Sequence, residues 1–421
     1  RFWQDAIDKE MKNVRIAFQE LPDGENPPAD FQFCRCHMIF DVKMEDFRRK
    51  ARLVAGGHMT KAPATLTYAS VVSRETVRIA LMTAALNDVD VWAADVLNAY
   101  ITAPCREKIW TILGPEFGED QGKKAIIVRA LYGLKSSGAA FREHLAGFMK
   151  EMGYSACRAD PDLWLKKCTN RGGKDYYAYI LCYVDDLLVI HHNPKKVMAR
   201  INQNLPLKED SVGRPKYYLG AKLRETEFSD GSKAWGLSPT KYVQTAVTNC
   251  EEHLKNNMAR KWTLVKDAKN PFPCECRPEE DVSPLLDPAE ASYYMQLIGI
   301  LRWMCELGRL DICTEVSMLS SFSAMPREGH MEAVLHIMAY LRDHKCSRLV
   351  FDPKMPEGIW DNFIECEWGH EYDDAQEEIP PNAPTPLGKP VRFRMYVDSD
   401  HAHDKSTTRS ITGIVIFIGR S

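Results

Sequence analysis

Residues 179–190, YILCYVDDLLVI, decide the fold of this chain. Two short apolar runs, rich in aromatic and β-branched side chains, flank a pair of acidic residues. This pattern predicts a β-hairpin with Asp185 and Asp186 in the connection between its strands. The tip of a hairpin projects both carboxylates beside a sheet, where they can coordinate a metal ion. Because Asp is also common in ordinary turns, the acidic pair alone does not define a site.

A third carboxylate lies upstream, at the end of a second apolar run. Residues 89–96 predict a strand that ends near Asp95. Carboxylates at the end of one strand and at the tip of a nearby hairpin can meet across a sheet. Two or three of them can hold a pair of divalent ions about 3.5–4 Å apart for in-line phosphoryl transfer. Magnesium suits such a site because it takes few carboxylates and keeps its waters, and manganese could substitute.

Several segments resemble, in the same order, motifs of the reverse transcriptase region of copia-type (Pseudoviridae-like) LTR retrotransposon Pol polyproteins. They are residues 50–55 (KARLVA, a fingers motif), 95–100 (DVLNAY, motif A), 130–138 (ALYGLKSSG, motif B), 183–186 (YVDD, motif C), 217–223 (YYLGAKL, before the thumb), 308–312 (GRLDI) and 394–402 (RMYVDSDHA, the start of ribonuclease H). The resemblance runs from about Trp3 to the end. Motif B departs from the family at 136–138, where Gln-Ala-Pro is usual, and Leu310 replaces a Pro.

The resemblance implies a role for each matched residue. Asp95 and Asp185 would be the main metal ligands, assisted by Asp186. The nucleotide-binding residues would be Lys50, Arg52, Tyr100, Gly133 and Lys135, with Lys50 and Arg52 on the triphosphate and Tyr100 as the steric gate against a ribose 2′-hydroxyl. The primer grip would be Tyr218, Leu219 and Gly220. Asp398 would be the first carboxylate of ribonuclease H, a domain that we expect to be too short here to cleave RNA.

The resemblance also implies an α+β fold of the right-hand polymerase type. We expect fingers and palm in residues 1–236, a thumb in 237–280 and a mainly helical connection in 281–370. A Pro- and acid-rich linker, 371–390, would lead to a fragment of ribonuclease H in 391–421. Helices are predicted from Trp3 to Val14, from Phe141 to Gly153, from an N-cap at Asp287, and around Val334 to Leu341.

Composition limits the class of protein without choosing a function. A net charge of −3 gives no general signal for nucleic acid, although a polymerase needs only a local basic channel. The 13 cysteines are scattered, which favours reduced thiols over a disulfide scaffold. No apolar run of about 18 residues is present, so we expect no membrane span. The family implies RNA template, DNA primer, RNA–DNA hybrid and deoxynucleoside triphosphates as partners, in a cytoplasmic virus-like particle and later in the nucleus.

Three alternatives stay open at this stage. The chain could be a decayed or domesticated nucleic-acid-binding module without catalysis, since motif B is altered. It could be an interaction module that uses the helices of 237–370 as a docking surface. Residues 34–37 (CRCH) and 274–276 (CEC) could bind zinc, although structural zinc sites usually have Cys pairs separated by two to four residues. We interpret His191-His192 as a surface pair and not as metal ligands.

Overall fold

The structure, a computed structural model, describes residues 2–42, 49–64, 66–256, 260–273, 276–354, 381, 383–402 and 404–420. These residues mix helices and sheets, as predicted, and form two compact units. The first unit comprises 1–76, 90–172 and 177–214, and the second comprises 77–89, 173–176 and 215–421. Within the described ranges, no helix is both long enough and apolar enough to cross a membrane.

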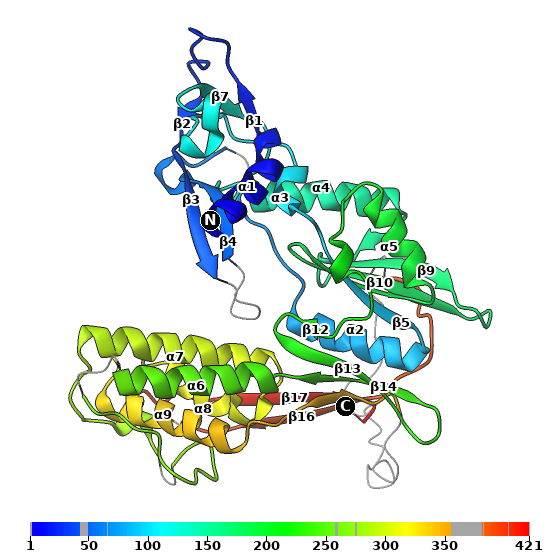
Figure 1. Ribbon diagram of the computed structural model, residues 1–421. Helices are drawn as coiled ribbons and strands as arrows, with labels where there is room; N and C mark the ends of the chain where they lie inside the picture. Colours follow the sequence, from blue (N-terminus) through cyan, green and yellow to red (C-terminus); the bar gives the residue numbers. More distant parts are fainter. Residues whose placement is uncertain are drawn as a thin grey trace. The chain divides into compact units, whose positions relative to one another are not determined.

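A five-stranded sheet at the centre of the first unit carries the acidic hairpin (Figure 1). Its strands, in spatial order, are β5 (Asp90–Asp95), β11 (Asp186–His191), β10 (Asp175–Tyr183), β9 (Leu163–Thr169) and β8 (Ser155–Ala156). The hairpin β10–β11 and the strand that ends at Asp95 are both confirmed. Residues 187–190 are buried, which explains why this strand is apolar throughout instead of alternating.

One helix packs its apolar face against this sheet. Helix α4 (Ser137–Glu151) buries Phe141, Leu145 and Met149 in one core with Ile180 and Leu187 of the hairpin. The helix ends where the sequence predicts, because Gly153 follows with a φ of +81°, a conformation that costs little only for Gly. This packing fixes the hairpin against a rigid support.

The remaining elements of the first unit form smaller sheets and short helices. They are α1 (Phe2–Val14), β1 (Phe18–Glu20), β2 (Gln32–Phe33), β3 (Cys36–Val42), β4 (Arg49–Ala55), α3 (Ala99–Thr102), β6 (Ile109–Ile112), β7 (Lys124–Ile127) and α5 (Pro194–Asn202). One sheet has the order β1-β7-β6-β2, and β3 pairs with β4 in an antiparallel ladder. The predicted helix from Trp3 to Val14 is confirmed as α1.

The second unit combines helices with a four-stranded sheet. Its elements are most of α2 (Arg74–Asn87), β12 (Tyr217–Tyr218), β13 (Ala221–Glu227), β14 (Lys233–Ser238), α6 (Thr240–Asn256), α7 (Pro288–Glu306), α8 (Cys313–Ser320), α9 (Glu328–Asp343), β15 (Leu349–Phe351), β16 (Phe393–Ser399) and β17 (Thr412–Ile418). Helices α6 to α9 lie side by side around one apolar core (Figure 1). The N-cap predicted at Asp287 is confirmed as a capping box with Glu290.

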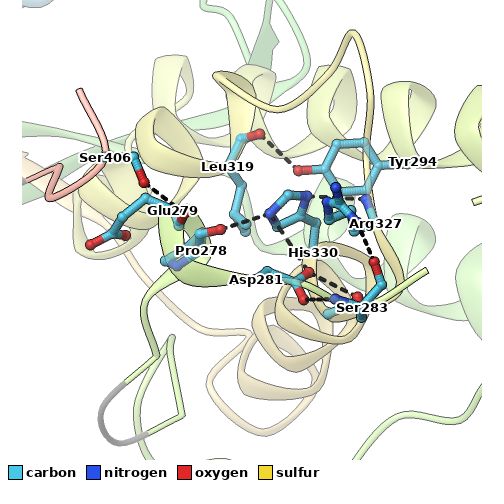
Figure 2. Close-up of polar contacts among 10 residues, drawn as sticks. Pro278, Glu279, Asp281, Ser283, Tyr294, Leu319, Arg327, His330 and Ser406 are labelled. Atoms are coloured by element: carbon cyan, nitrogen blue, oxygen red, sulfur yellow. Dashed lines mark hydrogen bonds and ion pairs between the residues drawn. The ribbon is translucent and has the colours of Figure 1, made fainter. Parts of the chain in front are cut away.

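A buried histidine ties the start of α9 to the segment before α7 (Figure 2). The Nε2 atom of His330 lies 2.8 Å from the carbonyl oxygen of Pro278, and the amide of Arg327 donates to its Nδ1 over 3.1 Å. Because a carbonyl only accepts and an amide only donates, Nε2 of His330 is the donor and Nδ1 is the acceptor in these two hydrogen bonds. The side chain of His330 is 3% exposed, so water cannot replace either partner.

Replacing His330 by Ala should lower the free energy of unfolding by about 2–3 kcal/mol, because it leaves two polar groups unpaired and opens a cavity. Urea denaturation of the whole chain measures this loss. His336→Ala is the matched control, since this ring lies on the same helix and its hydrogen bond to the carbonyl oxygen of Asn270 is exposed. Equal losses from the two variants would contradict a structural role specific to His330.

The predicted domain boundaries stay predictions. Residues 215–238 belong to the second, helical unit, whereas the sequence motifs assign residues up to 236 to fingers and palm. Most of the Pro- and acid-rich linker, residues 371–380 and 382, lies outside the described residues. The described residues after it form the antiparallel strand pair β16–β17.

Candidate active site

The three predicted carboxylates meet at one end of the central sheet. Asp95 is the last residue of β5, and the strand register pairs it with Asp186, the first residue of β11. Asp186 also pairs with Tyr183, so the two-residue turn is Val184-Asp185 instead of the predicted Asp185-Asp186. The amide of Val96 donates to the carbonyl of Asp185 over 2.8 Å, which holds the turn against the end of β5.

The turn itself is strained at one residue. Val184 has a φ of +56°, which is unfavourable for a β-branched side chain. A positive φ at the first central position alone is the pattern of a type II′ turn, where Gly is usual. Such strain persists only where the surrounding structure holds the residue, and it is found most often at functional sites.

The electrostatics of the carboxylates favour a bound cation. Burial and then the charge of Asp95 raise the pKa of Asp185. Burial, Asp185 and Asp95 together raise the pKa of Asp186 to about 6. Each shift reflects a cost of keeping like charges close together and away from water. A cation among these oxygens would offset that cost.

Two residues that the sequence did not reveal contact Asp95 from the segment after α5. The ammonium of Lys208 forms an ion pair with the Asp95 carboxylate, and the amide of Lys208 donates to the carbonyl of Asp95 over 3.0 Å. The hydroxyl of Ser211 accepts from the amide of Asp95 over 2.9 Å. No motif marks Lys208 or Ser211, because the contact joins residues more than a hundred positions apart.

The predicted steric gate and one predicted phosphate ligand share an aromatic neighbour. The Tyr100 ring lies 4.7 Å from that of Tyr132, centroid to centroid, and burial followed by the charge of Asp185 raises the pKa of Tyr100. The guanidinium of Arg52 lies 5.3 Å from the Tyr132 ring centre, a cation–π contact. The charge of Lys50 lowers the pKa of Asp185, so Lys50 lies near that carboxylate. The structure therefore brings Tyr100, Arg52 and Lys50 to one site.

Gly133 and Lys135 contact backbone segments next to that site. Gly133 has a φ of +92°, and a Cβ atom there would lie 2.0 Å from the carbonyl oxygen of Ala55. Only Gly permits this close approach of motif B to the end of β4. The ammonium of Lys135 donates to the carbonyl of Thr60 over 2.5 Å.

The other predicted site residues belong to the second unit. Tyr218 is buried at the end of β12, and Leu219 and Gly220 both have positive φ, which forms the type I′ turn of a two-residue hairpin. A Cβ atom added at Gly220 would lie 3.8 Å from the Nε1 atom of Trp303. Asp398 is exposed on β16 and pairs with Gly413.

The carboxylates fit a hard divalent cation by their chemistry. Oxygen donors are what magnesium and manganese prefer, and Lys208 already places a positive charge on Asp95. As the described side chains stand, no three of the His, Cys, Asp or Glu type are arranged to hold a metal ion directly. Of the Cys residues considered for zinc, Cys34 is buried, burial raises the pKa of Cys36 to about 12, and Cys274 lies outside the described residues.

A family model described as reverse transcriptase (RNA-dependent DNA polymerase) matches residues 25–258. This range contains all three carboxylates and the elements that position them, and it covers more than half of the chain. The chain therefore belongs to the reverse transcriptase family. The resemblance to copia-type retrotransposon Pol sequences is confirmed, and the family is one of RNA-dependent DNA polymerases.

The relatives are transposon proteins. The chain is 28% identical over 351 residues to the retrovirus-related Pol polyprotein from transposon TNT 1-94 of Nicotiana tabacum, over 80% of this chain and 25% of that protein. It is 24% identical over 355 residues to the retrovirus-related Pol polyprotein from transposon RE1 of Arabidopsis thaliana, over 80% of this chain and 22% of that protein. It thus spans about a quarter of these relatives. A solved foamy viral protease-reverse transcriptase in complex with ds DNA matches with a TM-score of 0.44 and 12% identity, over 82% of this chain and 48% of that one.

Proposed function

We propose that this chain extends a DNA primer on an RNA template, with Asp95, Asp185 and Asp186 as its essential carboxylates. The observation that carries the proposal is the strand register. It pairs Asp95 with Asp186 and sets Asp185 in the adjoining turn, within a chain of the reverse transcriptase family. Like-charge crowding among these carboxylates supports a cation-dependent reaction over a purely structural role.

Divalent ions held by these carboxylates, magnesium with manganese as a substitute, would lower the pKa of the primer 3′-hydroxyl and neutralise the leaving pyrophosphate. The residues of the chain position the substrates. Lys50 and Arg52, on β4, would contact the incoming triphosphate, Lys as a point charge and Arg as a planar fork. Lys208 keeps a positive charge on Asp95, which would limit repulsion among the carboxylates in the absence of nucleotide.

The larger architecture belongs to the same proposal. Residues 1–236 would supply fingers and palm, residues 237–280 the thumb and residues 281–370 the mainly helical connection. Tyr218, Leu219 and Gly220 would grip the primer end, Gly133 and Lys135 would line the nucleotide and template path, and Asp398 would begin a ribonuclease H-like domain. The partners would be RNA template, DNA primer and their hybrid, bound mainly through phosphates. This reaction would take place in a cytoplasmic virus-like particle, with later passage into the nucleus.

Truncating Tyr100 should weaken the selection of deoxynucleotides. Its ring packs on Tyr132 beside the carboxylates, so Tyr100→Ala opens space where a ribose 2′-hydroxyl would lie. We expect the ratio of kcat/KM for dTTP to that for UTP to fall about 10- to 200-fold. Single-nucleotide extension measures both values. Tyr68→Ala, at a side chain 73% exposed, is the control and should leave the ratio unchanged. An unchanged ratio in Tyr100→Ala would contradict the gate.

Metal dependence separates the proposed enzyme from a decayed binding module. The chain is freed of divalent ions with a chelator and mixed with a labelled RNA–DNA hybrid and dTTP. The proposal expects binding without extension, followed by extension when magnesium is restored. Salt-sensitive binding with no extension at any magnesium concentration would instead support the binding module. Extension in the presence of excess chelator would contradict the metal-dependent mechanism.

A further inference from the structure

One face of a sheet in the second unit is basic. This sheet has the strand order β12-β13-β14-β15, and Figure 1 labels β12, β13 and β14. Along β13, Leu223 is buried, whereas Lys222 and Arg224 on either side of it are exposed. Because side chains alternate across a sheet, Lys222 and Arg224 project from the same face. The strand register adds Tyr217, opposite Lys222, and Gly236, opposite Arg224, to that face.

The side chain of Arg348 lies across the same face at Gly236. A Cβ atom added at Gly236 would lie 2.8 Å from Cδ and 3.4 Å from Cγ of Arg348. The same Cβ atom would lie 3.6 Å from the backbone oxygen of Arg224 in the neighbouring strand. A glycine inside a strand often marks such a close approach. Since Arg348 is exposed, a third cation joins Lys222 and Arg224 on the solvent side of the sheet.

An exposed aromatic ring borders these cations. The side chain of Tyr217 is 51% exposed, and the ammonium of Lys241 lies 5.6 Å from the centre of its ring. Lys241 belongs to the first turn of α6, where the backbone amides carry partial positive charge and no acidic residue offsets it. We define the basic face by these five residues: Tyr217, Lys222, Arg224, Lys241 and Arg348.

The cations of the basic face are not neutralised by neighbouring carboxylates. Across the described part of the chain, Lys222, Arg224 and Arg348 form no ion pair with an acidic side chain. Asp352, directly after β15, is paired with Arg420 over 3.9 Å. Like charges close together on a sheet repel one another, so a bound anion would stabilise this face. Other basic side chains of the second unit are paired: Lys233 with Glu225, Arg342 with Glu251, and Lys354 with Asp230.

We propose that the basic face binds a single strand of nucleic acid through its phosphates, with one base stacked on Tyr217. Lys222 and Arg224 are two residues apart on one strand, roughly 7 Å at the usual rise of a β-strand, so they can contact successive phosphates. Stacking on an aromatic side chain needs an unpaired base, which favours a single strand over a duplex. The choice of nucleic acid as the partner rests on the proposed function. The contact itself belongs to the second unit, whereas the three carboxylates belong to the first.

The test measures binding of labelled oligo(dT) to the full chain by fluorescence anisotropy, with a chelator present and without nucleotide. Polymerisation cannot occur under these conditions, so the result is independent of the proposed reaction. Replacing Lys222 and Arg224 together by Gln should make the slope of log K against log salt shallower by about 1.4, since each phosphate contact on a single strand contributes about 0.7. Each single variant should change the slope by about 0.7, which decides the outcome if the double variant fails to fold.

Tyr217→Leu should weaken binding of oligo(dT) about 5- to 150-fold, because one stacked base is lost, and should leave the salt slope unchanged. Affinity for a blunt DNA duplex should change less than affinity for oligo(dT), since the bases of a duplex are already stacked on one another. This difference separates a single-strand contact from a general attraction to phosphates.

Two controls complete the experiment. Lys266→Gln with Lys269→Gln removes the same charge from exposed positions of the same unit and should leave both affinity and slope at wild-type values. Lys222→Arg keeps the charge and should bind as wild type does. If the folded Lys222→Gln, Arg224→Gln chain binds oligo(dT) as tightly as wild type, or loses affinity for duplex by the same factor, the proposal is overturned. A chain that shows the expected binding pattern but extends no primer would contradict the proposed function and leave this surface standing.

Discussion

Replacing Asp185 by Asn should lower the rate of nucleotide incorporation by about 10³-fold or more while leaving hybrid binding intact. The amide keeps the size of the side chain but loses the charge that a divalent cation needs. Loss of several kcal/mol of transition-state stabilisation corresponds to a rate effect of that size. The turn should keep its structure, because its hydrogen bond from the amide of Val96 is accepted by the backbone carbonyl of residue 185. Single-turnover extension at saturating magnesium measures the rate.

The matched control for this experiment is Asp398→Asn. Asp398 is an exposed carboxylate of the second unit, and we assign it to the ribonuclease H-like segment and not to polymerisation. Incorporation should therefore stay within about twofold of wild type, as is usual for exposed positions. An Asp185→Asn protein that still extends primers at the wild-type rate would contradict the assigned role of Asp185. Equal loss from both variants would show that the effect is not specific to the carboxylate site.

Replacing Arg309 by Met should produce the largest loss of stability, about 3 kcal/mol. The guanidinium makes the bidentate pair with Asp311, caps the carbonyl of His344 and lies 5.7 Å from the centre of the Tyr340 ring. Burial raises the pKa of Asp311, but the hydrogen bonds and the charge of Arg309 bring this pKa below its ordinary value. Met would leave that carboxylate and the carbonyl without their partner, and breaking a buried pair in this way typically costs about 3–5 kcal/mol. Since Asp311 is 39% exposed, we expect the lower end of that range.

Chemical denaturation followed by circular dichroism measures this loss. Arg302→Met is the matched control, because Arg302 is exposed on α7 and its substitution should cost less than about 0.5 kcal/mol. Adding Asp311→Asn to Arg309→Met should recover part of the loss, since the unpaired charge is then removed. A loss no greater than that of the control would mean that the Arg309 network does not stabilise the helical unit.

Local patterns predicted the elements that lie close together in the sequence. The apolar runs beside Asp185 predicted the hairpin, and Asp287 as an N-cap predicted the start of α7. Both predictions succeeded because strand pairing across a short turn and helix capping depend on neighbouring residues. The apolar run 89–96 predicted a strand that ends near Asp95, but the pairing of Asp95 with Asp186 could not follow from the pattern alone. The exact turn was missed by one residue, since nothing in the sequence favours a positive φ at Val184.

Contacts between distant segments could not be predicted in this way. The ion pair of Lys208 with Asp95 depends on how the chain after α5 returns to the central sheet. The bond from Arg309 to the carbonyl of His344 depends equally on the packing of α7 against α9. The motif GRLDI includes Arg309, but the motif alone does not predict that the Arg309 side chain bonds to the carbonyl of His344. Leu310, where the family has Pro, begins a short 3-10 helix, a position at which Pro is also favourable.

The most direct test of the account is the extension of a DNA primer on poly(rA) by the wild-type chain with dTTP and magnesium. The account predicts that the primer lengthens on this RNA template and that omitting either template or magnesium stops the reaction. A folded chain that binds the hybrid but leaves the primer at its original length would contradict it. In that case the intact carboxylates would belong to a protein that holds nucleic acid without copying it.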